Sequence, residues 1–307
     1  MQGSPIAVIR SFIRRYTLEV MNAVFDHDWL LRLIGLVGKK FGVIESVFLV
    51  YPASEEYALS YVFSYRLPKV KWDPWLCGAL LQNCKLSLMF CISASNSEYA
   101  EPANIDKLRK VTERMEKLRI LLGANRKTFA GIIPGVLHTR RIIRDVPEAD
   151  LTASAVAQAI DLIKVKESLS PETPIIVLGG KGFIGRRLVK LLNKATTFSI
   201  DLADGQGKKD WPNQLSGQRI IVVNITLNRA IEDYIDQMWP GTVVINEVYP
   251  EPDAIILQKL AEKKCQCYHV VGVKAAAFPQ FPLAYRGAIP CCAAWPAKKM
   301  KAVVKKL

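Results

Sequence analysis

Residues 175–189 read Ile-Ile-Val-Leu-Gly-Gly-Lys-Gly-Phe-Ile-Gly-Arg-Arg-Leu-Val, and this stretch decides the expected fold. Its first four residues predict a buried strand, and the apolar spacing after the last glycine predicts a helix. Between the two stands Gly-x-Gly-x-x-Gly, in which Gly180 permits a tight turn, Gly182 lets a pyrophosphate approach the backbone, and Gly185 lets the helix pack closely on the strand. In this strand–turn–helix setting the motif predicts a dinucleotide site.

The acid that such a site needs follows in a second predicted strand, residues 197–202. Asp201 lies there, about 20 residues after the glycines, where a carboxylate accepts hydrogen bonds from ribose hydroxyls and repels a 2′-phosphate. It therefore favours NAD over NADP, although two arginines after the motif also suit a phosphate. Phe183 and Ile184 complete the predicted cofactor-binding segment. The alternative is an ordinary glycine turn that binds no nucleotide.

Strands and helices alternate after the motif. Further strands are expected over residues 219–225, 242–247 and 267–271, and helices over 230–238 and 254–264. This alternation predicts an α/β fold with a Rossmann-like, doubly wound parallel sheet. The expected parts are a substrate or partner domain over residues 1–150, a dinucleotide-binding domain over 151–275, and a C-terminal segment, 276–307, that packs back on the first domain.

The N-terminal domain is expected to be α/β or mostly helical. Hydrophobic periodicity predicts two helices within 6–40, helices over 105–122 and 153–165, strands over 47–51 and 57–65, and a turn region over 127–135. Asp73 and Pro74 form a typical helix start. Cys77, Cys84 and Cys91 follow at seven-residue spacing, which places them on one face of that helix as buried, small apolar residues.

Composition narrows the class of protein. A chain of 307 residues, half of them hydrophobic, can bury a large core. No apolar run approaches the roughly 18 residues of a membrane span, and arginines interrupt the N-terminal apolar stretch, so we expect a cytoplasmic protein. Seven cysteines argue for reduced thiols, and the three histidines show no metal-ligand spacing with them.

The net charge of +14 predicts an acidic or anionic partner, such as a lipid surface, a protein or a substrate. No recognisable nucleic-acid module accompanies it, so nucleic acid is not expected. Part of the charge lies in residues 298–307, which predict a short basic helix, either solvated or in peripheral contact with a membrane.

Polar residues at the strand ends are the candidates for chemistry, because ligands bind beyond the carboxyl ends of strands in open α/β sheets. Asn224 and Thr226 suit a ribose or nicotinamide contact, and equally a cap for the loop that follows them. Tyr249 and Lys274 are candidate proton donors. The glycine motif is similar to that of the extended short-chain dehydrogenases, but their Tyr-x-x-x-Lys pair is missing after it, which disfavours that family.

Four pieces of sequence carry a closer resemblance. They are Gly123-Ala124, Thr152-Ala153, the Val-Ile-Asn-Glu-Val-Tyr-Pro run at 244–250, and Pro290-Cys291-Cys292-Ala293-Ala294. In this order they resemble the cyanobacterial-type long-chain acyl-[acyl-carrier-protein] reductases over about residues 120–295. The chain departs from that family at Lys181, inside the glycine motif, at Asp201, where NADPH use is expected, and in its short tail.

The resemblance implies an NAD(P)-dependent oxidoreductase that reduces an acyl thioester to an aldehyde. It implies a nucleophilic cysteine at Cys291, with Cys292 as the competitor, and an acidic acyl carrier protein as partner. A helix beginning at Pro290, or Arg286 nearby, would lower the thiol pKa. Two alternatives stay open: a shikimate-like or hydroxy-acid-like dehydrogenase that acts without covalent catalysis, and a non-catalytic nucleotide sensor that binds an acidic partner.

Overall fold

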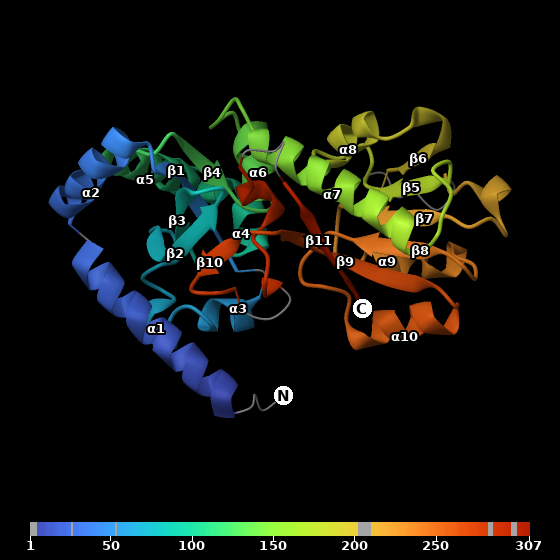
Figure 1. Cartoon of the computed structure of the whole chain (residues 1–307), viewed down its shortest axis with the longest axis horizontal. Helices are drawn as coiled ribbons and strands as arrows, with labels where there is room; N and C mark the ends of the chain where they lie inside the picture. The colour runs from blue at the N-terminus through green and yellow to red at the C-terminus, as the bar shows by residue number, and fades with distance from the viewer. Residues whose placement is uncertain (1–4, 26, 53, 202–209, 282–284, 296–299) are drawn as a thin grey trace. The chain divides into compact units, whose positions relative to one another are not determined.

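The computed structural model describes residues 5–25, 27–52, 54–201, 210–281, 285–295 and 300–307 (Figure 1). The chain forms two compact units, one of residues 1–148 and 275–295 and the other of 149–274 and 296–307. Each unit has its own sheet, and six of the nine strand pairings among the described residues are parallel. The α/β class predicted from the sequence is therefore confirmed.

The first unit is built on a five-stranded mixed sheet. Its strand order is β10 (Ala276–Phe278), β2 (Trp75–Gln82), β3 (Lys85–Cys91), β1 (Ile44–Val50) and β4 (Arg126–Phe129). Its helices are α1 (Pro5–Phe25), α2 (Asp28–Phe41), α3 (Glu55–Leu59), α4 (Asn96–Ala100), α5 (Ile105–Leu122) and α6 (Ile133–Thr139). The expected helix over 105–122 is confirmed as α5, and it ends at Gly123 in the left-handed conformation.

The stretch after Pro74 is a β-hairpin, so the predicted helix is wrong. Strands β2 and β3 pair antiparallel, and the turn between them holds Asn83 at φ 50° and Cys84 at φ 61°. Two successive positive φ values match the right-handed twist of a two-residue hairpin, which usually selects glycine at the second place. Here Cys84 occupies that second place, so the sequence lacks the glycine that would have indicated a hairpin. The three cysteines consequently lie on two strands and a turn, and they share no helical face.

Two shorter predictions for this unit are also wrong. Residues 57–65 form the end of α3 and turns in place of a strand, because Ser54 and two glutamates start a helix there. Residues 127–135 contain most of β4 and the start of α6, where a turn region was expected. Burial of Phe129 and Ile133 in the core explains this order.

The second unit is built on a six-stranded sheet. Its order is β11 (Ala302–Lys306), β9 (Gln266–Val273), β8 (Val243–Asn246), β7 (Ile221–Asn224), β5 (Ile175–Leu178) and β6 (Thr197–Ile200). Its helices are α8 (Gly185–Leu191), α9 (Ala230–Tyr234), α10 (Ala254–Glu262) and most of α7 (Pro147–Lys166). From β6 to β9 the strands are parallel, and every predicted strand of this region is present.

The strand order reverses direction at β5. The chain places β6 on one side of β5 and β7 on the other, so the carboxyl ends of β5 and β7 flank a topological switch point, where open α/β sheets bind ligands. The register aligns Leu178, Asn224, Asn246 and His269 in one row across four strands.

The C-terminal segment divides between the two units, which corrects the expectation that all of it returns to the first. Residues 275–295 belong to the first unit, where β10 pairs with β2, but β11 pairs with β9 in the second unit. The basic helix predicted over 298–307 is wrong for the same reason, since Val303 and Val304 complete a sheet edge. Lys298 and Lys299 lie outside the described residues.

Candidate functional site

The glycine motif forms the turn between β5 and α8, and each glycine there has its own steric reason. Gly179 adopts φ +82°, so the positive φ expected for the tight turn falls one residue before Gly180. A Cβ on Gly180 would lie 2.4 Å from the Ser199 hydroxyl of β6, and one on Gly185 would lie 2.0 Å from the carbonyl oxygen of Gly179. Gly182 is exposed, and its N–H donates to Gly179 at 2.9 Å. The backbone of this turn is therefore bare and tightly packed.

The residues that follow the glycines are half-buried. Phe183 lies under the guanidinium of Arg187, 4.5 Å from the ring centroid, and Ile184 precedes α8. Arg187 also donates to the carbonyl of Phe183 and pairs with Asp150 at 2.9 Å. The guanidinium of Arg187 is therefore engaged by contacts within the protein, whereas the side chain of Arg186 is exposed.

Asp201 directly follows β6, next to the strand that bears the glycine turn. Its carboxylate lies 3.7 Å from the ammonium of Lys181, which is inside the turn and has a side chain 63% exposed. This ion pair shows that Asp201, the acid predicted from its spacing, lies next to the glycine turn. Lys181 adds a cation that can meet a phosphate, a feature the spacing rule for Asp201 leaves out.

Asn224 and Thr226 occupy the neighbouring strand end in different ways. Thr226 contacts the turn itself, because a Cβ on Gly179 would lie 2.5 Å from the Thr226 Cβ. Asn224 is fully buried, and its amide donates to the carbonyl of Leu227 at 3.0 Å and to Asn246 at 2.9 Å. The loop-capping role, one of the two considered for Asn224, is the one that these bonds describe.

A buried polar row that the sequence reasoning missed runs along this edge. The Asn246 amide donates to the carbonyl of Val248 at 2.6 Å, and its other N–H meets Nδ1 of His269 at 3.1 Å. Nδ1 is thus an acceptor, so the ring proton sits on Nε2, which is buried without a partner among the described residues. Burial lowers the pKa of His269 to about 4. The available signal was an asparagine closing each of two apolar strands, with a histidine in register.

The surroundings of Tyr249 and Lys274, the two predicted proton donors, differ from each other. The Tyr249 ring meets His269 edge-on at 4.5 Å, and its hydroxyl donates to the carbonyl of Val271 at 2.8 Å. The hydroxyl proton of Tyr249 is therefore engaged in a hydrogen bond to the backbone of β9. Lys274 is exposed just after the same strand, and its backbone N–H donates to Lys301 at 2.8 Å.

Cys291 and Cys292 belong to the first unit, whereas the glycine turn belongs to the second. Both are thiols more than nine-tenths buried, and they form a single 3-10 turn with Ala293. This short turn stands where a helix was expected to begin at Pro290. The N-terminus of such a helix would have lowered the thiol pKa, and this source of positive potential is missing. Arg286 is exposed.

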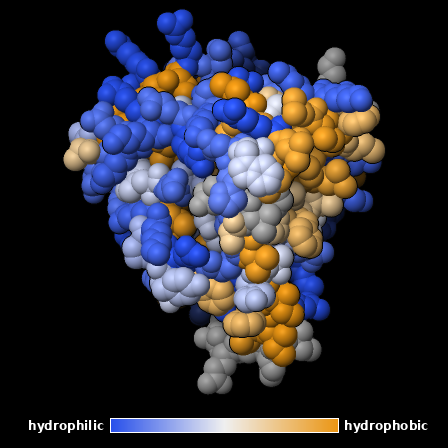
Figure 2. Space-filling view, turned by 90° about the vertical axis from the view of Figure 1, so that its left-hand side faces the viewer, coloured by the Kyte–Doolittle hydropathy of each residue, from blue (hydrophilic) through white to orange (hydrophobic). Residues whose placement is uncertain are grey.

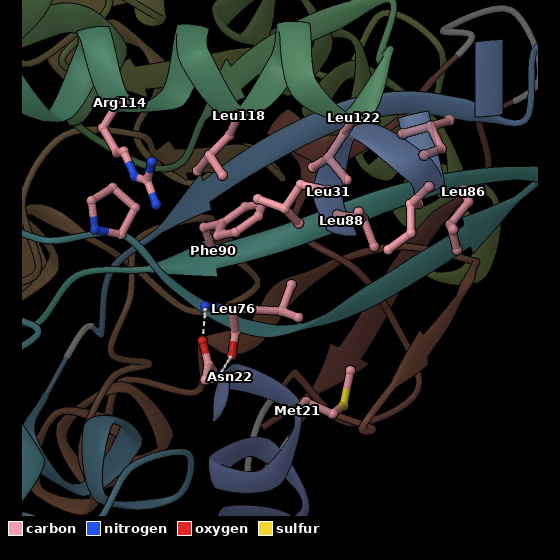
Figure 3. A pocket seen from close by; sticks show the side chains of 13 residues that line it. Met21, Asn22, Leu31, Leu76, Leu86, Leu88, Phe90, Arg114, Leu118 and Leu122 are labelled. Carbon is pink, nitrogen blue, oxygen red and sulfur yellow. Dashed lines mark hydrogen bonds between the residues drawn. The ribbon is translucent and has the colours of Figure 1, made fainter. Parts of the chain in front are cut away.

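The first unit also contains an apolar pocket of about 240 Å³, which residues of α1, α2 and α5 line together with residues of β1, β2 and β3 (Figure 3). Asn22 fastens α1 to β2 through two bonds to the backbone of Leu76, at 2.6 and 2.9 Å. Arg114 stands at one end of the pocket and pairs with Asp28 at 3.7 Å. The lining residues are Met21, Asn22, Leu31, Ile34, Ile44, Pro74, Leu76, Leu86, Leu88, Phe90, Arg114, Leu118 and Leu122.

Comparison of the chain with protein-family models and with curated proteins found no match. Within the described ranges, no group of His, Cys, Asp and Glu is arranged to hold a metal ion. The helices in the same ranges include none with the length and apolar character to cross a bilayer.

One pH dependence follows from Glu247, which comes directly after β8. Burial raises the pKa of its carboxyl to about 8, and burial raises that of Glu148 to about 7. Between its unfolded and folded pKa values, the folded state holds the proton that the unfolded state has lost, so stability falls as pH rises. We expect a fall between pH 7 and 8 of at most about 1.4 kcal/mol per pH unit. Glu247→Gln should remove most of this fall in urea unfolding, and the remainder belongs to Glu148.

The control for this experiment is Glu172→Gln, an exposed change, which should keep the wild-type profile. His269 acts in the opposite sense, because its lowered pKa makes stability rise between about 4 and 6.5, below the chosen window. Identical pH profiles for the wild type and Glu247→Gln would contradict the assignment.

Proposed function

We propose that the second unit binds a nicotinamide dinucleotide and that the protein is an NAD(P)-dependent oxidoreductase. The observation that carries the proposal is the bare glycine turn at the switch point, with the Asp201–Lys181 pair at its side. Counted from β5, the parallel strands have the order 2-1-3-4-5, one of the two common doubly wound orders, with ligands at the switch point. On this basis we regard the unit as Rossmann-like.

The proposed binding roles follow from the surroundings of each residue. Gly182, exposed and without a side chain, would admit the pyrophosphate, while Gly180 and Gly185 keep the turn compact. Asp201 would accept the ribose hydroxyls, which favours NAD. Lys181 lies close enough to Asp201 to neutralise it, or to meet a 2′-phosphate, so NADP is the second candidate.

We further propose that the substrate is an acyl thioester. Two observations in the first unit support this: the adjacent thiols of Cys291 and Cys292, and the apolar pocket, which suits an alkyl chain. The thiolate would form a new C–S bond to the acyl carbon, and the substrate's thiol would leave with a proton. Bound NAD(P)H would supply a hydride to that carbon. The C–S bond to the enzyme would then break, releasing an aldehyde and restoring the cysteine.

The partner in this reaction would be an acidic acyl carrier protein, to which a chain of net charge +14 is complementary. We propose that the protein itself is cytoplasmic. A second candidate function is a dehydrogenase that acts on a carbonyl or alcohol without covalent catalysis. The burial of both thiols favours this alternative, and Lys274, exposed after β9, is then the candidate proton donor.

The experiment begins with titration of NADH and NADPH into the full chain, followed by nucleotide fluorescence. The protein is then incubated with acyl thioesters of several chain lengths, without cofactor, and its intact mass is measured. We expect dinucleotide binding, an acyl adduct that Cys291→Ala abolishes, and discharge of the adduct by the reduced dinucleotide.

Cys265→Ala is the matched control, because it removes another buried thiol that belongs to the second unit. An adduct lost in Cys292→Ala and kept in Cys291→Ala would exchange their roles. Dinucleotide binding without any adduct would favour the non-covalent dehydrogenase. No binding of either dinucleotide would overturn the proposed function.

A further inference from the structure

Helices α1 and α2 turn apolar residues toward the solvent. The spacing of these residues is three or four along much of each helix, so they form a stripe on each. They are Val8, Ile9, Phe12, Ile13, Tyr16 and Val20 in α1, and Trp29, Leu33, Leu36, Val37 and Phe41 in α2, all 48–69% exposed. Figure 2 views the molecule from the side on which these helices lie and shows apolar side chains gathered along one edge. A surface helix normally presents its polar side to water.

The charges on the same helices are positive where they are exposed. The exposed cations are Arg10, Arg32, Lys39 and Lys40. Each helix contains one acid, and each acid is already paired: Glu19 with Arg66 at 2.7 Å and Asp28 with Lys117 at 2.5 Å. The surface therefore combines apolar side chains with cations, and its acids are neutralised.

An aromatic cluster joins this surface beside α1. Phe12 contacts Tyr16 and Phe63, with ring centroids 6.5 and 6.0 Å apart, and Phe63 stacks on Tyr65 at 5.7 Å. Tyr16 and Tyr65 are 61% and 62% exposed. Arg15 lies over Phe63 at 4.9 Å. Amphipathic aromatic rings of this kind are enriched at the boundary between lipid and water.

We propose that α1 and α2 dock the protein on an anionic phospholipid surface, lying in the plane of the headgroups. Basic helices with Trp, Phe and Leu on the opposite side bind membranes in this way, through apolar burial and attraction to anionic lipids. A second copy of the chain is a poorer occupant, because the cations of the two copies would face one another without acids between them. The proposal is independent of the proposed reaction.

The test is flotation of the full chain with vesicles of phosphatidylcholine alone or mixed with phosphatidylserine. We expect at least about tenfold stronger binding to the mixed vesicles, and weaker binding in high salt. Leu36→Asp/Val37→Asp should lower that binding by about tenfold or more, because it replaces two apolar side chains of the stripe by carboxylates. Neither residue belongs to the buried core, so the melting temperature should stay close to that of the wild type.

The matched control is Leu162→Asp/Val165→Asp in α7, which makes the same chemical change at exposed positions of the other unit. It should bind the mixed vesicles like the wild type. Absence of vesicle binding by the wild type, or unchanged binding by the α2 variant, would overturn the proposal. So would a dimer in sedimentation velocity that the α2 variant dissociates, since a second copy would then cover the stripe.

Discussion

Gly185→Ala is expected to lower the free energy of unfolding of the second unit by about 3 kcal/mol, at the upper end of overpacking effects. The added Cβ would lie 2.0 Å from the carbonyl oxygen of Gly179 and 2.8 Å from the Cα of Gly180. Both obstacles are backbone atoms, so no rotamer change can relieve the clash. The measurement is urea unfolding, combined with hydrogen exchange of the β5 and β7 amides. Dinucleotide binding should be lost as well.

Gly182→Ala is the comparison within the same turn. Its Cβ would meet the carbonyl oxygen of Gly179 at 3.0 Å, which a small shift relieves, so its loss of stability should be clearly smaller. If Gly182 admits the pyrophosphate, dinucleotide affinity should still fall. Equal stability of Gly185→Ala and the wild type would show that α8 does not pack on the end of β5 as described.

Asn246→Ala is expected to cost the second unit about 4 kcal/mol, from a cavity and several buried polar groups left without partners. The amide donates to Val248 and meets Nδ1 of His269, and its oxygen accepts from Asn224. The side chains of Asn224, Asn246 and His269 are all buried, the two asparagines at the ends of β7 and β8 and the histidine in register with them within β9. Urea unfolding measures the loss.

Asn193→Ala provides the control, because Asn193 is an exposed amide whose oxygen accepts from Ala195 at 3.1 Å. That change should cost about 1 kcal/mol. A loss for Asn246→Ala no larger than that would contradict the buried network. An NMR titration adds a second measurement, since the pKa of His269 should move from about 4 toward its ordinary value once its surroundings loosen.

The second unit was largely predictable, because its strands are short β-branched runs separated by helical periods and a glycine motif. Residues 221–224 and 243–246 illustrate this, since each is an uninterrupted apolar strand closed by asparagine. The sequence could not show that these asparagines join His269 in one row, because that depends on the register between strands. Nor could it show that Thr226 lies against Gly179 and Ser199 against Gly180, because these residues are distant in sequence.

The first unit was less predictable for a physical reason. A mostly apolar stretch such as 75–91 fits a buried helix and a buried hairpin equally well, and the turn at Asn83 and Cys84 lacks its usual glycine. The segment 302–306 has both valines and lysines, so basic amphipathicity competed with strand propensity, and pairing with β9 decided the outcome. The buried setting of Cys291 depends on tertiary packing and could not be found from spacing.

The chain passes between the two units at residues 148, 274 and 295, and this path constrains how the protein is made. Residues 274–301 separate β9 from β11 along the chain, so during folding the β9 edge stays unpaired until β11 adds to it. Open strand edges are the usual starting points of aggregation. The nascent second unit therefore passes through an interval of vulnerability, and a chaperone that shields an extended edge would act in that interval.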